Sequence, residues 1–401
     1  MSTTLTPTTI LQRVLEGHRT LFPFIGRMGV DFSTEAPLRL NQQVIAHVRS
    51  LPTAADYDGT TGYANGATSS RTLLTDLPIT VDSHKHVPVY LDHLDAIKDQ
   101  KDSFNGNLDG MAYVLGKAMV DSILDKCKGS NLSYSETETA ANSDLDVIEA
   151  ITTKMNGNGA SPMGRVGLVS SAVAQAIALD NRIGSKDYYG QLTGPGGLRV
   201  FKGVGGFEAI YEYPGLDTNN AATQTFTAAT TDICTAAAHG YSTGDRVRVS
   251  SGTTLPAGLA AATTYYVIKL TADTFKLAAS DALATAGTAV DVTDTGTGTH
   301  SIVGYENVTG LFYESQAIAL RAGLPSQSAE LARAMGIPQT MAMDSLTDPI
   351  NGFSLAYIRW MQTGTMDLYA TVASIWGSAV GRQAGAAAAL TDRSACLLRS
   401  A

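Results

Sequence analysis

Two glycine clusters are the first candidates for a binding site. They occupy residues 194–197 and 203–206. A glycine-rich loop cradles phosphate groups when it follows a strand and opens a helix. These clusters match neither the dinucleotide fingerprint GxGxxG nor the P-loop pattern GxxxxGK[ST], and no helix start follows them. We interpret them as turns between short strands that contain Val200 and Phe207.

Histidines and aspartates between residues 84 and 102 are the candidates for a metal site. His84, His86 and His93 bring three imidazoles, but the first two share one face of a predicted strand and no cysteine is close. The acidic residues that follow have lysines among them and do not form a calcium-binding loop; they are Asp92, Asp95, Asp99 and Asp102. We interpret the histidines as solvated or interface side chains and the acidic run as a solvated linker.

Candidate nucleophiles are equally unsupported. Cys127, Cys234 and Cys396 stand at no metal-ligand spacing, and their odd number disfavours a disulfide framework. The one match to the nucleophile pattern Gly-x-Ser-x-Gly, at residues 240–244, consists of turn residues and is not a strand that leads into a helix. We therefore predict no catalytic, cofactor-binding or metal-binding residues, no cofactor, and a protein that is not an enzyme.

Composition narrows the class of protein further. The chain has 401 residues, enough for two or three domains. Its net charge of −9, with no basic block, argues against tight direct binding of nucleic acid. The first residues lack the pattern of a signal peptide, and no apolar run approaches the about 20 residues of a membrane helix. We expect folding in a cytoplasm, reduced thiols and no membrane.

The first third of the chain predicts a hairpin and two helices. Even spacing of apolar residues from Leu40 to Val48 indicates a strand, and residues 73–81 and 84–91 indicate two more. Residues 53–70, between the first two of these strands, have almost no large aliphatic side chains. This predicts a long β-hairpin with a polar, mobile tip. A short helix is expected at 8–21 in an otherwise extended arm, and a helix of about 33 Å at 107–128.

The remainder alternates helices and strands around one all-β module. A helix at 144–155 with Ser143 as its cap, a strand at 165–169 and a helix at 171–179 precede strands at 198–201 and 207–213. Between residues 220 and 303 the composition shifts to Ala, Thr, Gly and Asp, with strands expected at 223–228, 246–250, 264–270, 274–277, 289–292 and 300–303. After it we expect a helix at 316–321 and a hairpin of 353–361 with 367–376. The fold class is α+β with a small all-β insertion domain.

Three segments outside the insert resemble the major capsid protein family of tailed bacteriophages. They are residues 189–216 (YGQLTGPGGLRVFKGVGGFEAIYEYPGL), 309–324 (TGLFYESQAIALRAGL) and 375–390 (IWGSAVGRQAGAAAAL). Their order resembles the capsid fold of the Hong Kong 97 phage type, in its branch with inserted domains. Segments of the insert, at 239–249, 255–270 and 271–278, are similar to a small β-module of phage virion proteins.

This resemblance implies a division of the chain. Residues 1–35 would be an N-terminal arm, 36–92 an extended loop with supporting strands, and 93–158 a peripheral domain with a spine helix. Residues 159–221 and 305–350 would form the axial domain, and 222–304 the inserted domain. The last part, 351–401, would be a hairpin and C-terminal strands returning to the axial and peripheral domains. Arm and extended loop are expected not to bury themselves and to be ordered by neighbouring subunits.

The function implied is a structural one. Copies of the chain would assemble into pentamers and hexamers of an icosahedral shell in the host bacterial cytoplasm, with a portal protein at one vertex. Scaffolding and decoration proteins are optional partners, and double-stranded DNA would be enclosed without sequence-specific binding. Two alternatives are a tail or fibre protein whose β-insert recognises a receptor, and an encapsulin-like compartment shell.

Some capsids of this type join subunits by an isopeptide bond from an extended-loop lysine. Residues 38–84 contain no lysine, and Arg39, Arg49 and Arg71 are too firmly protonated to attack an amide. Lys85 is the nearest amine and lies at the base of the predicted hairpin. The expectation is a non-covalent shell.

Overall fold

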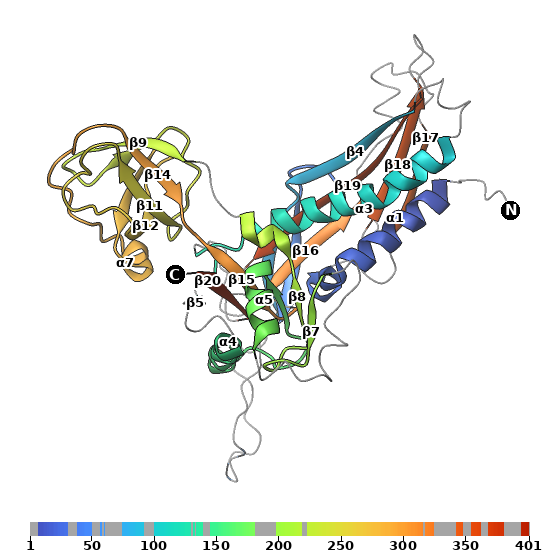
Figure 1. Ribbon diagram of the computed structural model, residues 1–401, viewed down its shortest axis with the longest axis horizontal. Coiled ribbons are helices and arrows are strands. Elements are labelled where there is room, and N and C mark those ends of the chain that lie inside the picture. The colour runs from blue at the N-terminus through green and yellow to red at the C-terminus, as the bar shows by residue number, and fades with distance from the viewer. Residues whose placement is uncertain are drawn as a thin grey trace.

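The computed structural model describes most of the chain. The described residues are 7–30, 38–49, 57, 60, 74–91, 100–129, 131–132, 134–138, 145–180, 198–218, 223–315, 317–324, 342–347, 354–361, 368–380 and 394–400. They form two mixed sheets with four helices, a separate two-stranded ribbon and a closed barrel (Figure 1). The predicted α+β class is confirmed.

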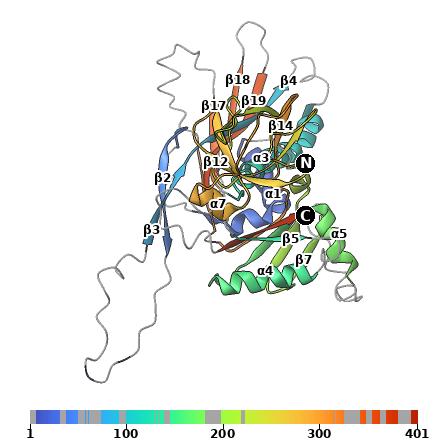
Figure 2. The same ribbon diagram turned by 90° about the vertical axis from the view of Figure 1, so that its left-hand side faces the viewer.

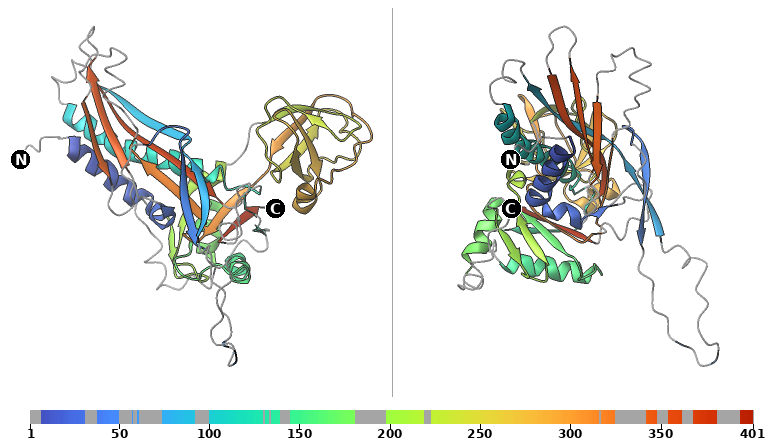
Figure 3. Two further views of the ribbon diagram at one scale, coloured as in Figure 1. Left: turned by 180° about the vertical axis from the view of Figure 1, so that it is seen from behind. Right: turned by 90° about the vertical axis from the view of Figure 1, so that its right-hand side faces the viewer.

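The first sheet is built around one long strand. β19 (Leu368–Val380) pairs with β4 (Ser83–Leu91), β18 (Ser354–Met361) and β16 (Ile318–Gly323), and the sheet is completed by β17 (Ala342–Thr347) and β1 (Gly29–Val30). Helices α1 (Pro7–Leu21) and α3 (Gln100–Leu124) lie side by side along it (Figures 1 and 3). Trp376 of β19 is fully buried beneath α3, and its Nε1 donates a hydrogen bond of 2.8 Å to Ser122 Oγ.

The second sheet shares one apolar core with the first. Its order is β5 (Ser135–Glu138), β20 (Ala395–Ser400), β15 (Val308–Tyr313), β6 (Val166–Val169), β8 (Ala209–Glu212) and β7 (Val200–Lys202). One face contributes to the core that also contains α1, α3 and Trp376. The other face packs with α4 (Leu145–Gly157) and α5 (Ser171–Leu179). The two sheets therefore form one continuous body.

The barrel lies to one side of this body (Figure 1). It closes in the order β10 (Cys234–Thr235), β13 (Thr274–Ala278), β12 (Thr264–Lys269), β11 (Arg246–Ser251), β14 (His300–Gly304) and β9 (Gln224–Ala228). Among the described strands, each of these pairs only with other barrel strands. Phe275, Val267 and Ile302 are in its own apolar core, and α7 (Asp281–Ala286) covers one side.

The ribbon consists of β2 (Gln43–Arg49) and β3 (Leu74–Thr80). They pair in antiparallel register from Gln43 opposite Thr80 to Arg49 opposite Leu74, which confirms the predicted hairpin. Figure 2 shows the ribbon running along one side of the body. Of the predicted mobile tip, 53–70, all but Tyr57 and Thr60 lies outside the described residues.

Several other element predictions are confirmed. The structure has α1 where a helix was expected at 8–21, α4 at 144–155 and α5 at 171–179. β18 pairs with β19 from Ala356 opposite Ala373 to Met361 opposite Leu368, as expected for the hairpin of 353–361 with 367–376. The Ser143 cap and the turn of this hairpin lie outside the described residues.

Four predictions are wrong. Residues 316–321 were expected to be helical, but β16 is a strand whose residues are all buried, so no alternation marks it. Residues 289–292 form no strand. The long helix begins at Gln100 instead of 107, because its first turns are polar and give no apolar period, and it ends at Leu124. The arm was expected to remain unburied, yet Leu11, Val14, Phe24 and Ile25 are in the core.

The packing also bears on the proposed domain limits. A limit at residue 158 would separate α4 from the second sheet, against which it packs through Ile148, Ile151 and Met155. A limit at residue 350 would assign β16 and β17 to the axial part, although both pair within the first sheet. The chain passes from the second sheet, at β15, to the first sheet, at β16. Limits drawn in chain order therefore do not coincide with the two sheets.

Candidate interaction surfaces

The ribbon presents one packed face and one exposed face. On the packed face, Ala46, Leu77 and Ile79 contact Ala319 of β16 and Ala379 of β19. On the opposite face, Ile45 stands opposite Pro78, and Ile45 is 51% exposed. Leu40, just before the ribbon, is 52% exposed. A two-stranded ribbon is marginal by itself, so the small residues beneath it are what position it.

Backbone groups fix the base of the ribbon. The amide of Asn41 donates to Val81 O at 2.7 Å, and the amide of Val81 donates to Gln42 O at 2.9 Å. Gly377 of β19 lies directly below, where an added Cβ would be 2.2 Å from Thr80 O and 2.7 Å from Val81 Cα. The ribbon can approach the sheet this closely only because residue 377 has no side chain.

The histidines of the predicted metal candidate lie on β4. His84 and His86 stand opposite Ile375 and Ala373 of β19 and are exposed. The part of the His84 ring that is covered by neighbouring residues loses solvation, which lowers its pKa, and repulsion from His86 adds to this effect. His93 and the side chains of the acidic run lie outside the described part of the chain. Among the residues that the structure describes, no three His, Cys, Asp or Glu side chains are grouped to hold a metal ion.

The second glycine cluster forms a turn, as interpreted. Gly203, Gly205 and Gly206 have φ values of 69°, 57° and 81° and connect β7 to β8. At Gly205 an added Cβ would be 2.5 Å from Ile148 Cγ2 of α4, so this glycine lets the turn pack closely against that helix. The cluster at 194–197 lies outside the described residues.

The three cysteines are free and buried. Burial raises the pKa of each thiol, Cys127, Cys234 and Cys396, to about 12. A thiol is nucleophilic only as the thiolate, so these side chains are inert at neutral pH. They act as small apolar residues in three different parts of the molecule.

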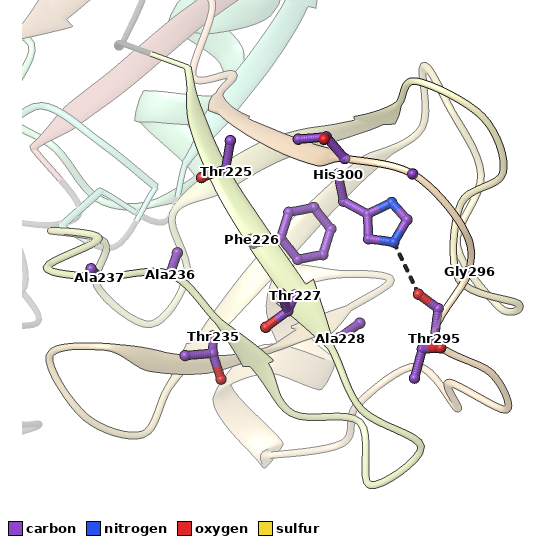
Figure 4. A pocket seen from close by; sticks show the side chains of 12 residues that line it. Thr225, Phe226, Thr227, Ala228, Thr235, Ala236, Ala237, Thr295, Gly296 and His300 are labelled. Atoms are coloured by element: carbon purple, nitrogen blue, oxygen red, sulfur yellow. Dashed lines mark hydrogen bonds between the residues drawn. The ribbon is translucent and has the colours of Figure 1, made fainter.

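The barrel carries an open groove with a volume of about 490 Å³ (Figure 4). Its lining is rich in hydroxyl groups and contains no charged residue; it includes Thr225, Thr227, Thr235, Thr295 and Thr299. The ring of Phe226 lies beside that of His300, with centroids 5.6 Å apart. Both ring nitrogens of His300 are engaged, by Ser251 Oγ at 3.0 Å and Thr295 O at 2.9 Å. The histidine is thus a structural part of the barrel.

A buried ion pair lies where the barrel meets the body, and no sequence pattern reveals it. Arg399 Nη2 of β20 donates to Glu306 Oε2 at 3.0 Å, and both side chains are almost fully buried. The two residues are 93 positions apart in the chain. Only pairing of β15 with β20 brings them together, so a local motif cannot indicate this contact.

None of the helices in the described residues is long and apolar enough to cross a bilayer.

Comparisons with known proteins give structural neighbours only. No protein-family model matches the chain, and no curated protein matches it. A capsid structure of cyanophage P-SCSP1u has 11% identity and a TM-score of 0.43, covering 92% of this chain and 87% of that one. The mature capsid of bacteriophage PhiM1 has 12% identity and a TM-score of 0.41, with 94% and 86% covered. The capsid of Ralstonia phage GP4 has 9% identity and a TM-score of 0.41, with 94% and 89% covered.

Proposed function

We propose that this chain is the major capsid protein of a tailed bacteriophage. In this proposal it is a non-catalytic subunit that forms pentamers and hexamers of an icosahedral head around double-stranded DNA. The first sheet with α1 and α3 is the peripheral domain, α3 is its spine, the second sheet is the axial domain, and the ribbon is the extended loop. The barrel is the inserted domain.

The observation that carries the proposal is the ribbon. An element of two strands lies along one side of the body, with one face seated on small residues and Ile45 half exposed on the other. Exposed apolar side chains on a marginal element are stabilised when another molecule covers them. Repeated copies of the same chain supply that cover at every position of a closed shell.

The partners belong to the capsid proposal, and the net charge of the chain agrees with the role proposed for DNA. A subunit with a net charge of −9 encloses DNA without binding it tightly, because tight binding to phosphates requires clustered Lys and Arg side chains. A portal protein at one vertex, and scaffolding or decoration proteins, belong to the same proposal, as does assembly in the host bacterial cytoplasm. Helices along a mixed sheet disfavour the alternative of a fibre protein, since fibres consist mostly of β repeats.

Electron microscopy of the purified, expressed protein tests this proposal. We expect closed shells, and we expect the variant Ile45→Asp to remain as folded subunits or small oligomers. The new carboxylate lies on the exposed face of the ribbon. The free energy of unfolding of the subunit should therefore stay within about 0.5 kcal/mol of the parent's value. Sedimentation and circular dichroism report assembly and folding separately.

A matched control places the same change on the barrel. Leu270 is 47% exposed, and Leu270→Asp is expected to assemble normally because it leaves the ribbon unchanged. Shells formed by Ile45→Asp at the parent's yield would contradict the role of the ribbon. Fibres or monodisperse small particles from the parent would contradict the capsid proposal itself.

Covalent linkage is a separate prediction. Lys85, the lysine nearest to the ribbon in the sequence, lies on β4 opposite Ser374 of β19 and is exposed. It belongs to the first sheet and cannot reach along the ribbon. Mature particles heated in denaturant and reductant should give one band near 42.0 kDa on a gel. A ladder of oligomers with a junction peptide containing Lys85 would show that this lysine is a cross-linking residue.

A further inference from the structure

The barrel and the body do not share an apolar core. The two apolar clusters of the barrel contain no residue of the body, and the clusters of the body contain none of the barrel, within the residues described. Burial of apolar surface is the main favourable term in most stable domain contacts. Here the contact between the two parts must rest on polar groups.

One carboxylate joins these parts. Glu306 follows β14 and accepts three hydrogen bonds: from the amide of Gly129 at 3.1 Å, from the amide of Arg246 at 2.7 Å and from Arg399 Nη2 at 3.0 Å. Gly129 follows α3, Arg246 begins β11 of the barrel and Arg399 lies on β20. A single side chain therefore ties the barrel to a helix end and to a strand of the body.

The surroundings of Glu306 leave little freedom. An added Cβ at Gly129 would lie 2.9 Å from Gly244 O of the barrel and 3.2 Å from Arg399 Nη2. Beside it, the guanidinium carbon of Arg248 lies 3.4 Å from the ring centroid of Tyr305. Asn307 Nδ2 donates to Ser400 O at 3.0 Å. These contacts, together with the three bonds of Glu306, define the junction.

The charges of the junction are incompletely satisfied. Three of its polar atoms are buried and have no hydrogen-bond partner in the described structure: Asp245 Oδ1, Arg246 Nε and Arg399 Nε. Burial raises the pKa of Glu306, Arg399 opposes this effect, and the nearby Asp245 carboxylate reinforces it. A buried pair of this kind adds little net stability compared with apolar residues, but removal of one partner is strongly unfavourable. The junction therefore fixes one geometry of barrel and body but contributes little net free energy to holding them together.

We infer that the Glu306 junction is a releasable latch, which holds the barrel in one orientation on the body and opens without unfolding either part. The closed state is defined by the three hydrogen bonds of Glu306. In the open state the barrel keeps its core and its six paired strands and changes its orientation relative to the body. The inference does not depend on the proposed function.

Distances between spin labels in the full-length subunit test the latch. The labels are placed at Thr263→Cys on the barrel and Glu149→Cys on α4, both exposed, while the native cysteines are buried. We expect one narrow distance distribution in the parent and a broad one in Glu306→Gln. Hydrogen exchange of the Gly129 and Arg246 amides should rise about tenfold or more in this variant, while amides of β12 keep their protection.

Two further variants keep the test decisive. Glu208→Gln is the control. It removes an exposed ion pair with Arg27 in which both residues belong to the body, so it should keep the narrow distance distribution of the parent. The double variant Glu306→Leu with Arg399→Leu removes both charges of the buried pair together, so it should fold even where the single variant does not, and its distribution should also be broad. A narrow distribution in both Glu306 variants, or loss of protection in β12 of the folded double variant, would overturn the latch.

Discussion

The variant Gly377→Ala is expected to lift the ribbon from the body and to abolish assembly. Its new methyl group would meet Thr80 O at 2.2 Å and Val81 Cα at 2.7 Å, and both are backbone atoms that no side-chain rotation can move. Overpacking at a close contact costs about 1–3 kcal/mol. The ribbon is the element that can yield, because β19 is held on both sides by β4, β18 and β16. Amide exchange in 74–81 should rise sharply.

A second glycine provides the control for this variant. Gly110 lies in α3, and an added Cβ there would have no atom within 4 Å. Gly110→Ala should be neutral or stabilise the chain by about 0.5–1 kcal/mol, since alanine is the better helix former. If Gly377→Ala kept the parent's exchange rates in 74–81 and still formed shells, the close approach of ribbon and sheet would be irrelevant to assembly.

The second large effect is expected in the barrel. Phe275 is fully buried and lies against Phe226, His239 and Tyr241, with ring centroids 5.1 to 6.4 Å apart. Truncation to alanine should destabilise the barrel by about 3–5 kcal/mol. Because barrel and body have separate cores, Phe275→Ala should lower one thermal transition and leave the transition of the body unchanged. Calorimetry of the full-length subunit measures both.

The control for the barrel is an exposed apolar residue of the same domain. Leu283 of α7 is 39% exposed, and Leu283→Ala should shift the barrel transition little. Residues 220–304 expressed alone should likewise melt cooperatively with a β-type circular dichroism spectrum. A single transition of the whole chain, lowered as one by Phe275→Ala, would show that the barrel is not autonomous.

The sequence alone was sufficient for the elements with a clear local pattern. Residues 171–179 form α5 at the predicted bounds, because Val173, Ala174 and Ile177 repeat on one helical face and Ser170 Oγ accepts from the Val173 amide. Buried residues recur at every second position of the barrel strands, and β11 shows this pattern from Arg246 to Val249, where Val247 and Val249 are buried and the two arginines are partly buried. The edges of the insert could also be predicted, because the amino-acid composition changes there within a few residues.

The tertiary structure decided the features whose causes lie far apart in the chain. β16 is buried on both faces, so its residues show no alternation of buried and exposed positions, and Ala319, Leu320 and Ala322 equally suit a helix. The apolar face of the arm's helix, which includes Leu11 and Val14, is covered by α3 and the first sheet, and residues 1–35 do not indicate which segments of the chain supply this cover.

The junction and the seat of the ribbon depend on the same kind of long-range contact. Glu306 meets Gly129, Arg246 and Arg399 only after α3, β11 and β20 have been positioned, and Gly377 is indispensable only because Thr80 lies above it. Local propensity depends on neighbours within a few residues, whereas burial, close approach and charge pairing depend on which distant segments pack together. Most of the elements could therefore be predicted from the sequence, but the contacts that position the ribbon and the barrel could not.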